Sequence, residues 1–166
     1  MTRVRESFSS LAEWVGVFLI AFAVFALVRV FIVAPFTVPT GSMEPTIQVG
    51  DNVLAQKVSV RMGRGASTGD IVVFDNPVAD TEHDILVKRV IAQGGQTVDM
   101  VDGVVYVDGV ALSEPYTRGL PSYTLASDVS YPYTVPEGYL WMMGDNRTNS
   151  QDSRFFGAIP VSSVTG

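Results

Sequence analysis

Residues 11–33 read LAEWVGVFLIAFAVFALVRVFIV, an apolar stretch that only Glu13 and Arg29 interrupt. About 20 helical residues, each rising about 1.5 Å, span a hydrocarbon core of about 30 Å. The stretch therefore predicts a transmembrane helix over residues 11–33. A buried core helix and a cleaved secretory signal are the alternatives. A cleaved signal needs small residues after its apolar region, whereas the triplet Ala21-Phe22-Ala23 lies inside this one.

The basic residues around the stretch predict its orientation. Arg3 and Arg5 precede it closely, whereas Lys57 is the first basic residue after it. Because Lys and Arg near a span favour the cytoplasmic side, we expect residues 1–10 in the cytoplasm. Residues 34–166 should then form one extracytoplasmic domain.

The overall composition excludes several classes of function. The chain has 166 residues, of which 47% are hydrophobic and 17% charged, so it is not intrinsically disordered. Its net charge of -6 has the wrong sign for a protein that coats nucleic acid. The absence of cysteine removes thiolate metal sites and cysteine nucleophiles, and His83 is the only histidine. We therefore expect no nucleic-acid partner, no metal and no other cofactor.

The domain after the apolar stretch has the pattern of β-strands. Short segments rich in Val and Ile alternate with Gly, Asp and Pro, and no segment keeps an apolar period near 3.6 residues. The expected strands cover residues 52–60, 70–74, 85–92 and 96–101. Asp102-Gly103 predicts a tight hairpin to residues 104–107, and a variable excursion is expected around residues 97–138. The fold class is therefore mainly β, an antiparallel β-sheet domain behind a single N-terminal transmembrane helix.

A candidate nucleophile lies just beyond the apolar stretch. If residues 36–42 are extended, then Phe36, Val38, Thr40 and Ser42 face one way, which gives an apolar surface followed by two hydroxyls. A serine needs a base to become a nucleophile, and the hydroxyl two residues earlier could donate to a developing oxyanion. A polar juxtamembrane turn is the alternative interpretation.

Lys88 is the candidate base, in the segment ILVKRVI at residues 85–91. Burial among aliphatic side chains disfavours the ammonium form, which lowers the lysine pKa and allows it to act as a general base near neutral pH. The pattern fits a lysine on an exposed sheet edge equally well. His83, in a polar stretch with acidic neighbours, is typical of a solvated loop residue.

Four motifs follow one another along the chain. They are Gly41-Ser42-Met43-x-Pro45-Thr46, then Gly50-Asp51, then Gly69-Asp70-Ile71-Val72-Val73-Phe74 with Val87-Lys88-Arg89-Val90, and finally Gly144-Asp145-Asn146-Arg147-x-Asn149-Ser150-x-Asp152-Ser153-Arg154. In this order they resemble the boxes of the bacterial type I signal peptidases, the leader peptidase family of Ser/Lys serine proteases. Lys88 stands where the endoplasmic-reticulum relatives carry histidine, which points to the bacterial branch. Thr148 departs from the Asp that is frequent in the last box.

The resemblance implies a role for each matching residue. Ser42 would be the nucleophile and Lys88 the general base. Thr40 would donate to the oxyanion together with the Ser42 N–H, and Ser150 would hydrogen-bond and orient the Lys88 amine. The supporting side chains would be Arg147 and the ion pairs Arg89–Asp145 and Asp152–Arg154. The side chains implied to bind substrate are Phe36, Val38, Met43, Ile47, Leu86 and Val87.

The resemblance also implies the activity and its setting. The chain would be a monomeric, membrane-bound serine endopeptidase of the bacterial plasma membrane. It would remove signal peptides from secreted preproteins after an Ala-x-Ala-like site, through an acyl-enzyme, with the signal peptide and the lipid bilayer as partners. Two other classes compete with it. A self-cleaving Ser/Lys repressor would carry a DNA-binding module instead of the apolar stretch, and a noncatalytic membrane-tethered β module would leave Ser42 and Lys88 as coincidence.

Overall fold

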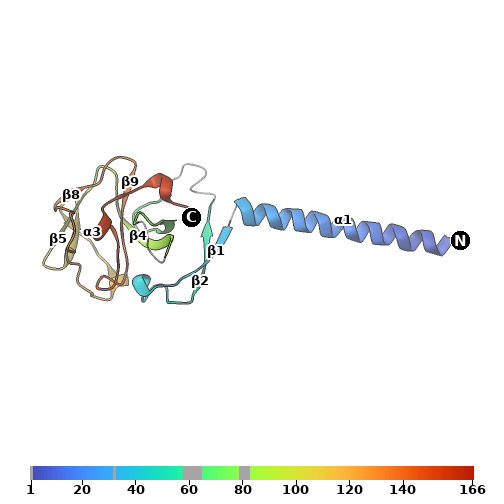
Figure 1. Cartoon of the computed structure of the whole chain (residues 1–166), viewed down its shortest axis with the longest axis horizontal. Coiled ribbons are helices and arrows are strands. Elements are labelled where there is room, and N and C mark those ends of the chain that lie inside the picture. The colour runs from blue at the N-terminus through green and yellow to red at the C-terminus, as the bar shows by residue number, and fades with distance from the viewer. Residues whose placement is uncertain (1, 32, 58–64, 79–82) are drawn as a thin grey trace.

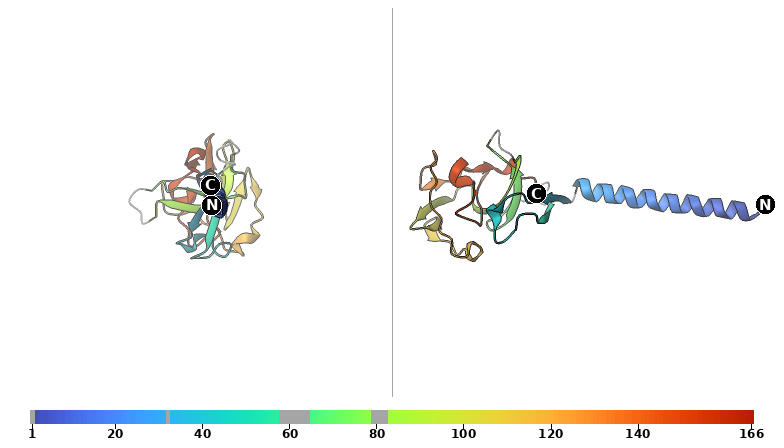
Figure 2. Two further views of the ribbon diagram at one scale, coloured as in Figure 1. Left: turned by 90° about the vertical axis from the view of Figure 1, so that its right-hand side faces the viewer. Right: turned by 60° about the horizontal axis from the view of Figure 1, so that its bottom comes forward.

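An N-terminal helix stands clear of a β domain in the computed structural model, which describes residues 2–31, 33–57, 65–78 and 83–166 (Figure 1; Figure 2, right). The helix, α1, runs from Thr2 to Phe31. Its window Leu11–Arg29 has a mean hydropathy of 2.4, and none of the window is buried against the rest of the chain. By length and composition, α1 can therefore cross a membrane. Strand β1 begins at Val33, the last residue of the predicted span.

The described strands form three antiparallel sheets. The first pairs β1 (Val33–Thr37) with β2 (Asn52–Gln56). The second has the order β10 (Ile159–Pro160), β9 (Tyr139–Met143), β4 (Ile85–Gln93), β3 (Ile71–Asp75). The third has the order β7 (Val110–Ala111), β6 (Val104–Val107), β5 (Thr97–Val101), β8 (Tyr133–Thr134). Figure 1 shows this third sheet at the end of the domain farthest from α1.

The predicted fold class, mainly β with antiparallel sheets, is confirmed. The first expected strand is shorter than predicted, since β2 ends at Gln56, and residues 58–60 lie outside the described residues. The predicted hairpin is present, because Asp102 (φ 51°) and Gly103 (φ 81°) both have the positive φ that a type I′ turn needs. Short helical turns complete the chain: η1 (Gly41–Met43), η2 (Pro115–Thr117), α3 (Ser153–Phe156) and η3 (Val161–Ser163).

The β4–β9 pair separates two apolar cores. Val90 and Met142 face one core with Phe74, whereas Trp141 faces the other core with Val98. Side chains alternate along a strand, so neighbouring residues normally point to opposite faces. A register shift between Val90 and Ala92 marks a β-bulge, and it leaves both Ile91 and Ala92 on the Trp141 side. The β4–β9 pair thereby contributes buried side chains to both cores.

The expected excursion returns to the domain. Within residues 97–138, β8 pairs with β5, placing Thr97 opposite Thr134. The Ser122 N–H also donates to the carbonyl of Gly103 at 2.8 Å, which holds the middle of the excursion against the hairpin. The excursion is therefore integrated into the third sheet.

The first half of β4 has an open edge. Strand β9 pairs with residues 89–93, and β3 pairs along the other side of residues 85–89. Among the described strands, only β3 therefore pairs with residues 85–88. Their second side therefore forms a strand edge that another extended segment could pair with, although the Val87 carbonyl already accepts a hydrogen bond from Lys88 Nζ.

Candidate active site

Ser42 and Lys88 meet in the folded chain although they are 46 residues apart. Lys88 Nζ donates a hydrogen bond to Ser42 Oγ at 2.6 Å and a longer one to the Val87 carbonyl at 3.1 Å. The Lys88 side chain projects from β4 and is buried, so it is not a lysine on an exposed edge. A hydroxyl and an amine at this distance can exchange a proton directly.

Ser42 lies in a turn rather than at the end of a strand. Strand β1 ends at Thr37, the backbone stays extended at Thr40, and Gly41–Met43 forms the turn η1. The prediction that the chain stays extended through Ser42 is therefore wrong, because a 3-10 turn begins at Gly41. The turn nevertheless brings Ser42 Oγ to Lys88 and leaves Thr40 Oγ1 3.4 Å from Ser42 Oγ.

The surroundings of Lys88 lower its pKa. Burial disfavours the ammonium form, while the negative charge of Asp152 partly opposes that effect, and together they bring the pKa of Lys88 from 10.5 to about 8. A sizeable fraction of the amine is therefore neutral near physiological pH. A neutral amine next to a serine hydroxyl has the chemistry of a general base.

The last motif is bonded to the turn that carries Ser42. The Asn146 N–H donates to the Ser42 carbonyl, and Asn146 Nδ2 donates to the Gly41 carbonyl, both at 3.0 Å. The neighbouring Asp145 accepts two hydrogen bonds from Arg89, from Nε at 2.8 Å and from the second guanidinium nitrogen at 2.7 Å. Thr46 Oγ1 also donates to Asp145 at 2.5 Å. The motif thus connects the Ser42 turn to the residue after Lys88.

The second implied ion pair is also present. Asp152 accepts two hydrogen bonds from the Arg154 guanidinium, each at 2.9 Å, and both side chains are buried. The same carboxylate accepts from the Gly144 N–H at 3.0 Å and caps the first turn of α3. Asp152 therefore fixes the backbone on both sides of the last motif.

Arg147 has a partner outside the motifs. Its guanidinium makes two hydrogen bonds to Glu114, at 2.8 and 2.6 Å, and one to Ser122 Oγ at 2.6 Å. Arg147 Nε donates to the Gly144 carbonyl at 2.9 Å. The excursion thus supplies the counter-ion for this buried arginine.

Ser150 is placed differently from expectation. Its Oγ is buried without a hydrogen-bond partner among the described residues, and the expected bond to the Lys88 amine is not formed. The Lys88 amine is directed to Ser42 Oγ and the Val87 carbonyl instead. Ser150 Oγ packs so closely on Gly144 that it leaves no space for a Cβ there.

A small cavity lies beside Ser42. It has a volume of about 20 Å³. Its lining comprises Val38, Pro39, Thr40, Ser42, Met43, His83, Ile85, Leu86 and Val87. Four of the six side chains implied to bind substrate line this space. His83, a half-buried loop residue just before β4, also lines this cavity.

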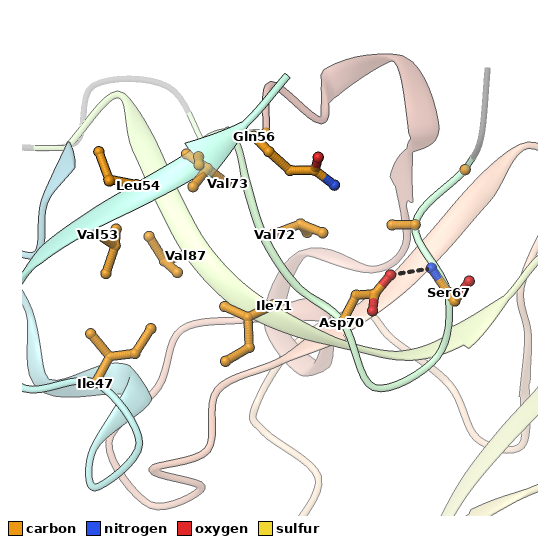
Figure 3. Close-up of a pocket in the computed structure, with 14 residues that line it drawn as sticks. Ile47, Val53, Leu54, Gln56, Ser67, Asp70, Ile71, Val72, Val73 and Val87 are labelled. Atoms are coloured by element: carbon orange, nitrogen blue, oxygen red, sulfur yellow. Dashed lines mark hydrogen bonds between the residues drawn. The ribbon is translucent and has the colours of Figure 1, made fainter. Parts of the chain in front are cut away.

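A larger cavity of about 540 Å³ lies between β2 and β3. Figure 3 shows Ile47, Val53 and Val87 at its apolar end. Asp70 lies at the other end, where it accepts a hydrogen bond from the Ser67 N–H at 2.9 Å. Val87 lines both cavities, so the two spaces are neighbours. Phe36 lines neither of them.

The profile of the family described as "Signal peptidase, peptidase S26" matches residues 11–166. The chain belongs to this peptidase family. The match includes both the apolar helix and the β domain, so the signal peptidase resemblance is confirmed.

Individual relatives agree with this family. The chain is 36% identical over 159 residues to a probable signal peptidase I-1 of Synechocystis, an alignment that covers 93% of this chain and 78% of the relative. It is 38% identical over 151 residues to a signal peptidase I of Bacillus licheniformis, covering 88% and 79% of the two chains. A crystal structure of a signal peptidase I from Enterococcus faecalis is 34% identical and has a TM-score of 0.51, covering 61% of this chain and 94% of that one.

Sequence reasoning missed several contacts around the site. Asn146 and Thr46 lie inside the quoted motifs, so the signal peptidase boxes already contained them. Glu114 lies in the excursion without any recognisable motif. No local pattern connects it to Arg147, because the two are 33 residues apart.

Proposed function

We propose that this chain is a signal peptidase I in which Ser42 is the nucleophile and Lys88 the general base. It removes signal peptides from secreted preproteins through an acyl-enzyme. The observation that carries the proposal is the 2.6 Å contact between Lys88 Nζ and Ser42 Oγ, in which the amine is buried and its pKa lowered to about 8. A buried lysine that stayed charged would need a carboxylate partner, whereas the amine of Lys88 contacts a hydroxyl.

The proposed reaction has two acyl-transfer steps. Neutral Lys88 takes the proton of Ser42 Oγ as that oxygen attacks the scissile carbonyl carbon. The C–N bond then breaks, the leaving amine receives the proton from Lys88, and the signal peptide remains as an ester on Ser42. A water molecule next gives its proton to Lys88 and attacks the ester, and Ser42 regains its proton as the peptide acid leaves. No external oxidant or cofactor is needed for this balance.

Thr40 is the proposed side-chain donor to the oxyanion. Its Oγ1 lies 3.4 Å from Ser42 Oγ, so a carbonyl carbon bonded to Ser42 would place its oxygen near the Thr40 hydroxyl. A donor fixed before the reaction stabilises the developing negative charge without reorganisation. The Ser42 N–H is the second proposed donor.

The small cavity supports a preference for a small residue before the cleaved bond. A space of about 10–15 Å³ accommodates one water molecule, and the cavity beside Ser42 measures about 20 Å³. It therefore accepts a side chain about the size of the methyl group of alanine. Larger side chains would have to displace Leu86, Met43 or their neighbours.

The open edge of β4 supports binding of the substrate as an added strand. Residues 85–88 offer backbone groups to an extended peptide. In such a peptide, every second side chain faces the same way. One side chain would enter the small cavity and the one two residues before it the apolar end of the larger cavity, because Val87 borders both. This arrangement fits an Ala-x-Ala-like site.

The proposed setting is the plasma membrane of a bacterium, with α1 as its single span. Arg3 and Arg5 precede the apolar window, which favours a cytoplasmic N-terminus and an extracytoplasmic β domain. The site follows the window closely, and a substrate with its own apolar segment in the same bilayer would hold its cleavage site near Ser42. Protease added to intact protoplasts should then digest the β domain and spare an N-terminal tag, whereas protection of the β domain would reverse the orientation.

The activity is tested by cleavage of a preprotein with an Ala-x-Ala site by the full chain in detergent. Wild type should release the mature protein, while Ser42→Ala and Lys88→Met should each be inactive. The double variant should lose little more than either single variant, because the pair acts as a unit. The exposed Ser113, changed to Ala, is the matched control and should retain full activity. Cleavage by Ser42→Ala would contradict the proposal, and inactivity of a folded wild type would favour the noncatalytic module.

A further inference from the structure

Tyr116 lies between two of the arginines that surround the dyad. Its ring centroid is 4.1 Å from Arg89 Cζ and 5.9 Å from Arg147 Cζ. Tyr116 belongs to η2, in the segment between β7 and β8. A guanidinium within about 6 Å of an aromatic centroid is attracted to the ring face. The excursion therefore contacts Arg89, the residue directly after Lys88.

Glu114 fixes both the ring and the second arginine. One of its carboxylate oxygens accepts a hydrogen bond from the Tyr116 hydroxyl at 2.9 Å and another from Arg147 at 2.6 Å. The Arg147 side chain is fully buried, and a buried guanidinium without a carboxylate partner is strongly destabilising. Burial and the nearby charge of Glu114 raise the pKa of Tyr116, so its hydroxyl stays protonated as a donor. Glu114 thus determines where Tyr116 and Arg147 lie.

Arg89 is held by hydrogen bonds as well as by the Tyr116 ring. Two of its nitrogens donate to Asp145, a third donates to the Gly69 carbonyl at 2.8 Å, and its face lies on Tyr116. Because Asp145 precedes Asn146, which donates to the Ser42 carbonyl, Arg89 connects the strand of Lys88 to the turn of Ser42. A shift of Arg89 would change the distance between the two reacting side chains.

We propose that Tyr116 and Glu114 are positioning residues for the reaction, which hold Arg89 and Arg147 and thereby fix the separation of Lys88 and Ser42. This inference rests on the proposed roles of Ser42 and Lys88. It gives the segment from Glu114 to Ser122 a part in turnover, although no residue of that segment belongs to the four motifs. A misplacement of about 1 Å can cost about 100-fold in rate, so the separation of the two side chains matters for turnover.

The test compares Tyr116→Leu, Tyr116→Phe and the control Tyr123→Leu, whose side chain is exposed. Each variant is assayed as the full chain in detergent with an Ala-x-Ala preprotein. The rate is expressed per Ser42 that reacts with an acylating active-site probe. Tyr116→Leu removes the ring and should lower kcat by about 2- to 30-fold, with KM within about 2-fold of wild type. Tyr116→Phe keeps the ring but loses its hydrogen bond to Glu114, so its kcat should lie between those of wild type and Tyr116→Leu. Tyr123→Leu should match wild type.

The outcomes separate this proposal from the proposed function. If wild type is active and Ser42→Ala inactive, but Tyr116→Leu keeps the wild-type kcat per reactive Ser42, the positioning role is overturned while the dyad stands. Tyr116→Leu could instead lower only the fraction of Ser42 that reacts with the probe, or only the thermal unfolding midpoint. Either result would show that Tyr116 is merely structural. Equal losses of kcat in the Phe and Leu variants would assign the effect to the hydroxyl and overturn the role of the ring.

Discussion

Lys88 Nζ and Ser42 Oγ form a 2.6 Å hydrogen bond in a site where the amine has almost no solvent exposure. The carboxylates nearest in the last motif are occupied by arginines, Asp145 by Arg89 and Asp152 by Arg154. Lys88 is therefore left with a hydroxyl as its side-chain partner rather than with a carboxylate. Burial keeps the pKa of the amine low, against the opposing charge of Asp152, and this low pKa determines how the site should respond to pH and to substitution.

Activity should fall as the pH drops below about 8. Because the pKa of Lys88 is about 8, the neutral amine is the main form above that pH and is lost below it. Well below the pKa, kcat/KM should fall about tenfold for each pH unit. The measurement is a pH–rate profile under conditions where the fold is intact and chemistry limits turnover. A rate that stays constant down to pH 5 would rule out a lysine base.

Lys88→Met should stabilise the folded chain at neutral pH. The pKa of Lys88 falls from 10.5 in the unfolded chain to about 8 in the folded one, so the unfolded chain binds more protons between these values. Stability of wild type therefore rises with pH across this window, and at pH 7 the buried lysine costs about 3 kcal/mol relative to pH 10.5 and above. Denaturant unfolding in detergent should be measured at pH 7 and at pH 10.5. The increase in the free energy of unfolding caused by Lys88→Met should be smaller at the higher pH. An equal gain at both would mean that the amine is not desolvated.

Thr40→Val should lose about 100- to 1000-fold in kcat, the usual cost of removing one oxyanion donor. Thr40→Ser keeps the hydroxyl and should stay active. The two variants differ from wild type by small changes in volume, so their contrast isolates the hydroxyl. Single-turnover cleavage of the same preprotein is the measurement, and a Thr40→Val enzyme near the wild-type rate would assign the donor role to another group.

His83→Ala should change which substrates are cleaved more than how fast the preferred one is cleaved. His83 lines the small cavity beside Ser42, so its removal enlarges a space of about 20 Å³. Cleavage after alanine should stay close to wild type, while cleavage after a larger residue such as valine should rise. The measurement is the ratio of kcat/KM for the two substrates. Loss of all cleavage would instead make His83 part of the catalytic machinery.

The local parts of the fold follow from local signals. The Asp102-Gly103 hairpin, the strands around Lys88 and the apolar helix each have a short sequence pattern with a direct physical cause. The pairing of Ser42 with Lys88 came from the resemblance, since spacing alone left Lys88 undecided between an edge strand and a buried base. The turn at Gly41–Met43 was not predicted, because Pro39 and Gly41 fit both an extended and a turned backbone.

The distant contacts could not be predicted in the same way. Glu114 follows β7, an edge strand of the third sheet, and meets Arg147 from a segment 33 residues away in the sequence. Likewise, Ser150 was expected to bond Lys88, yet its Oγ packs against Gly144. Such contacts depend on how elements pack together rather than on the residues next to them in the chain. A single sequence contains no direct record of that packing.

The open edge at residues 85–88 of β4 has a consequence for timing in the cell. A peptide can use that edge only while its own backbone groups are unpaired over about three or four residues, or roughly 10–13 Å of extended chain. In helices and complete sheets the backbone N–H and C=O groups are already hydrogen-bonded. An Ala-x-Ala sequence within a folded domain is therefore protected by its own structure. The edge would thus restrict cleavage to a polypeptide that has not yet folded around the cleavage site.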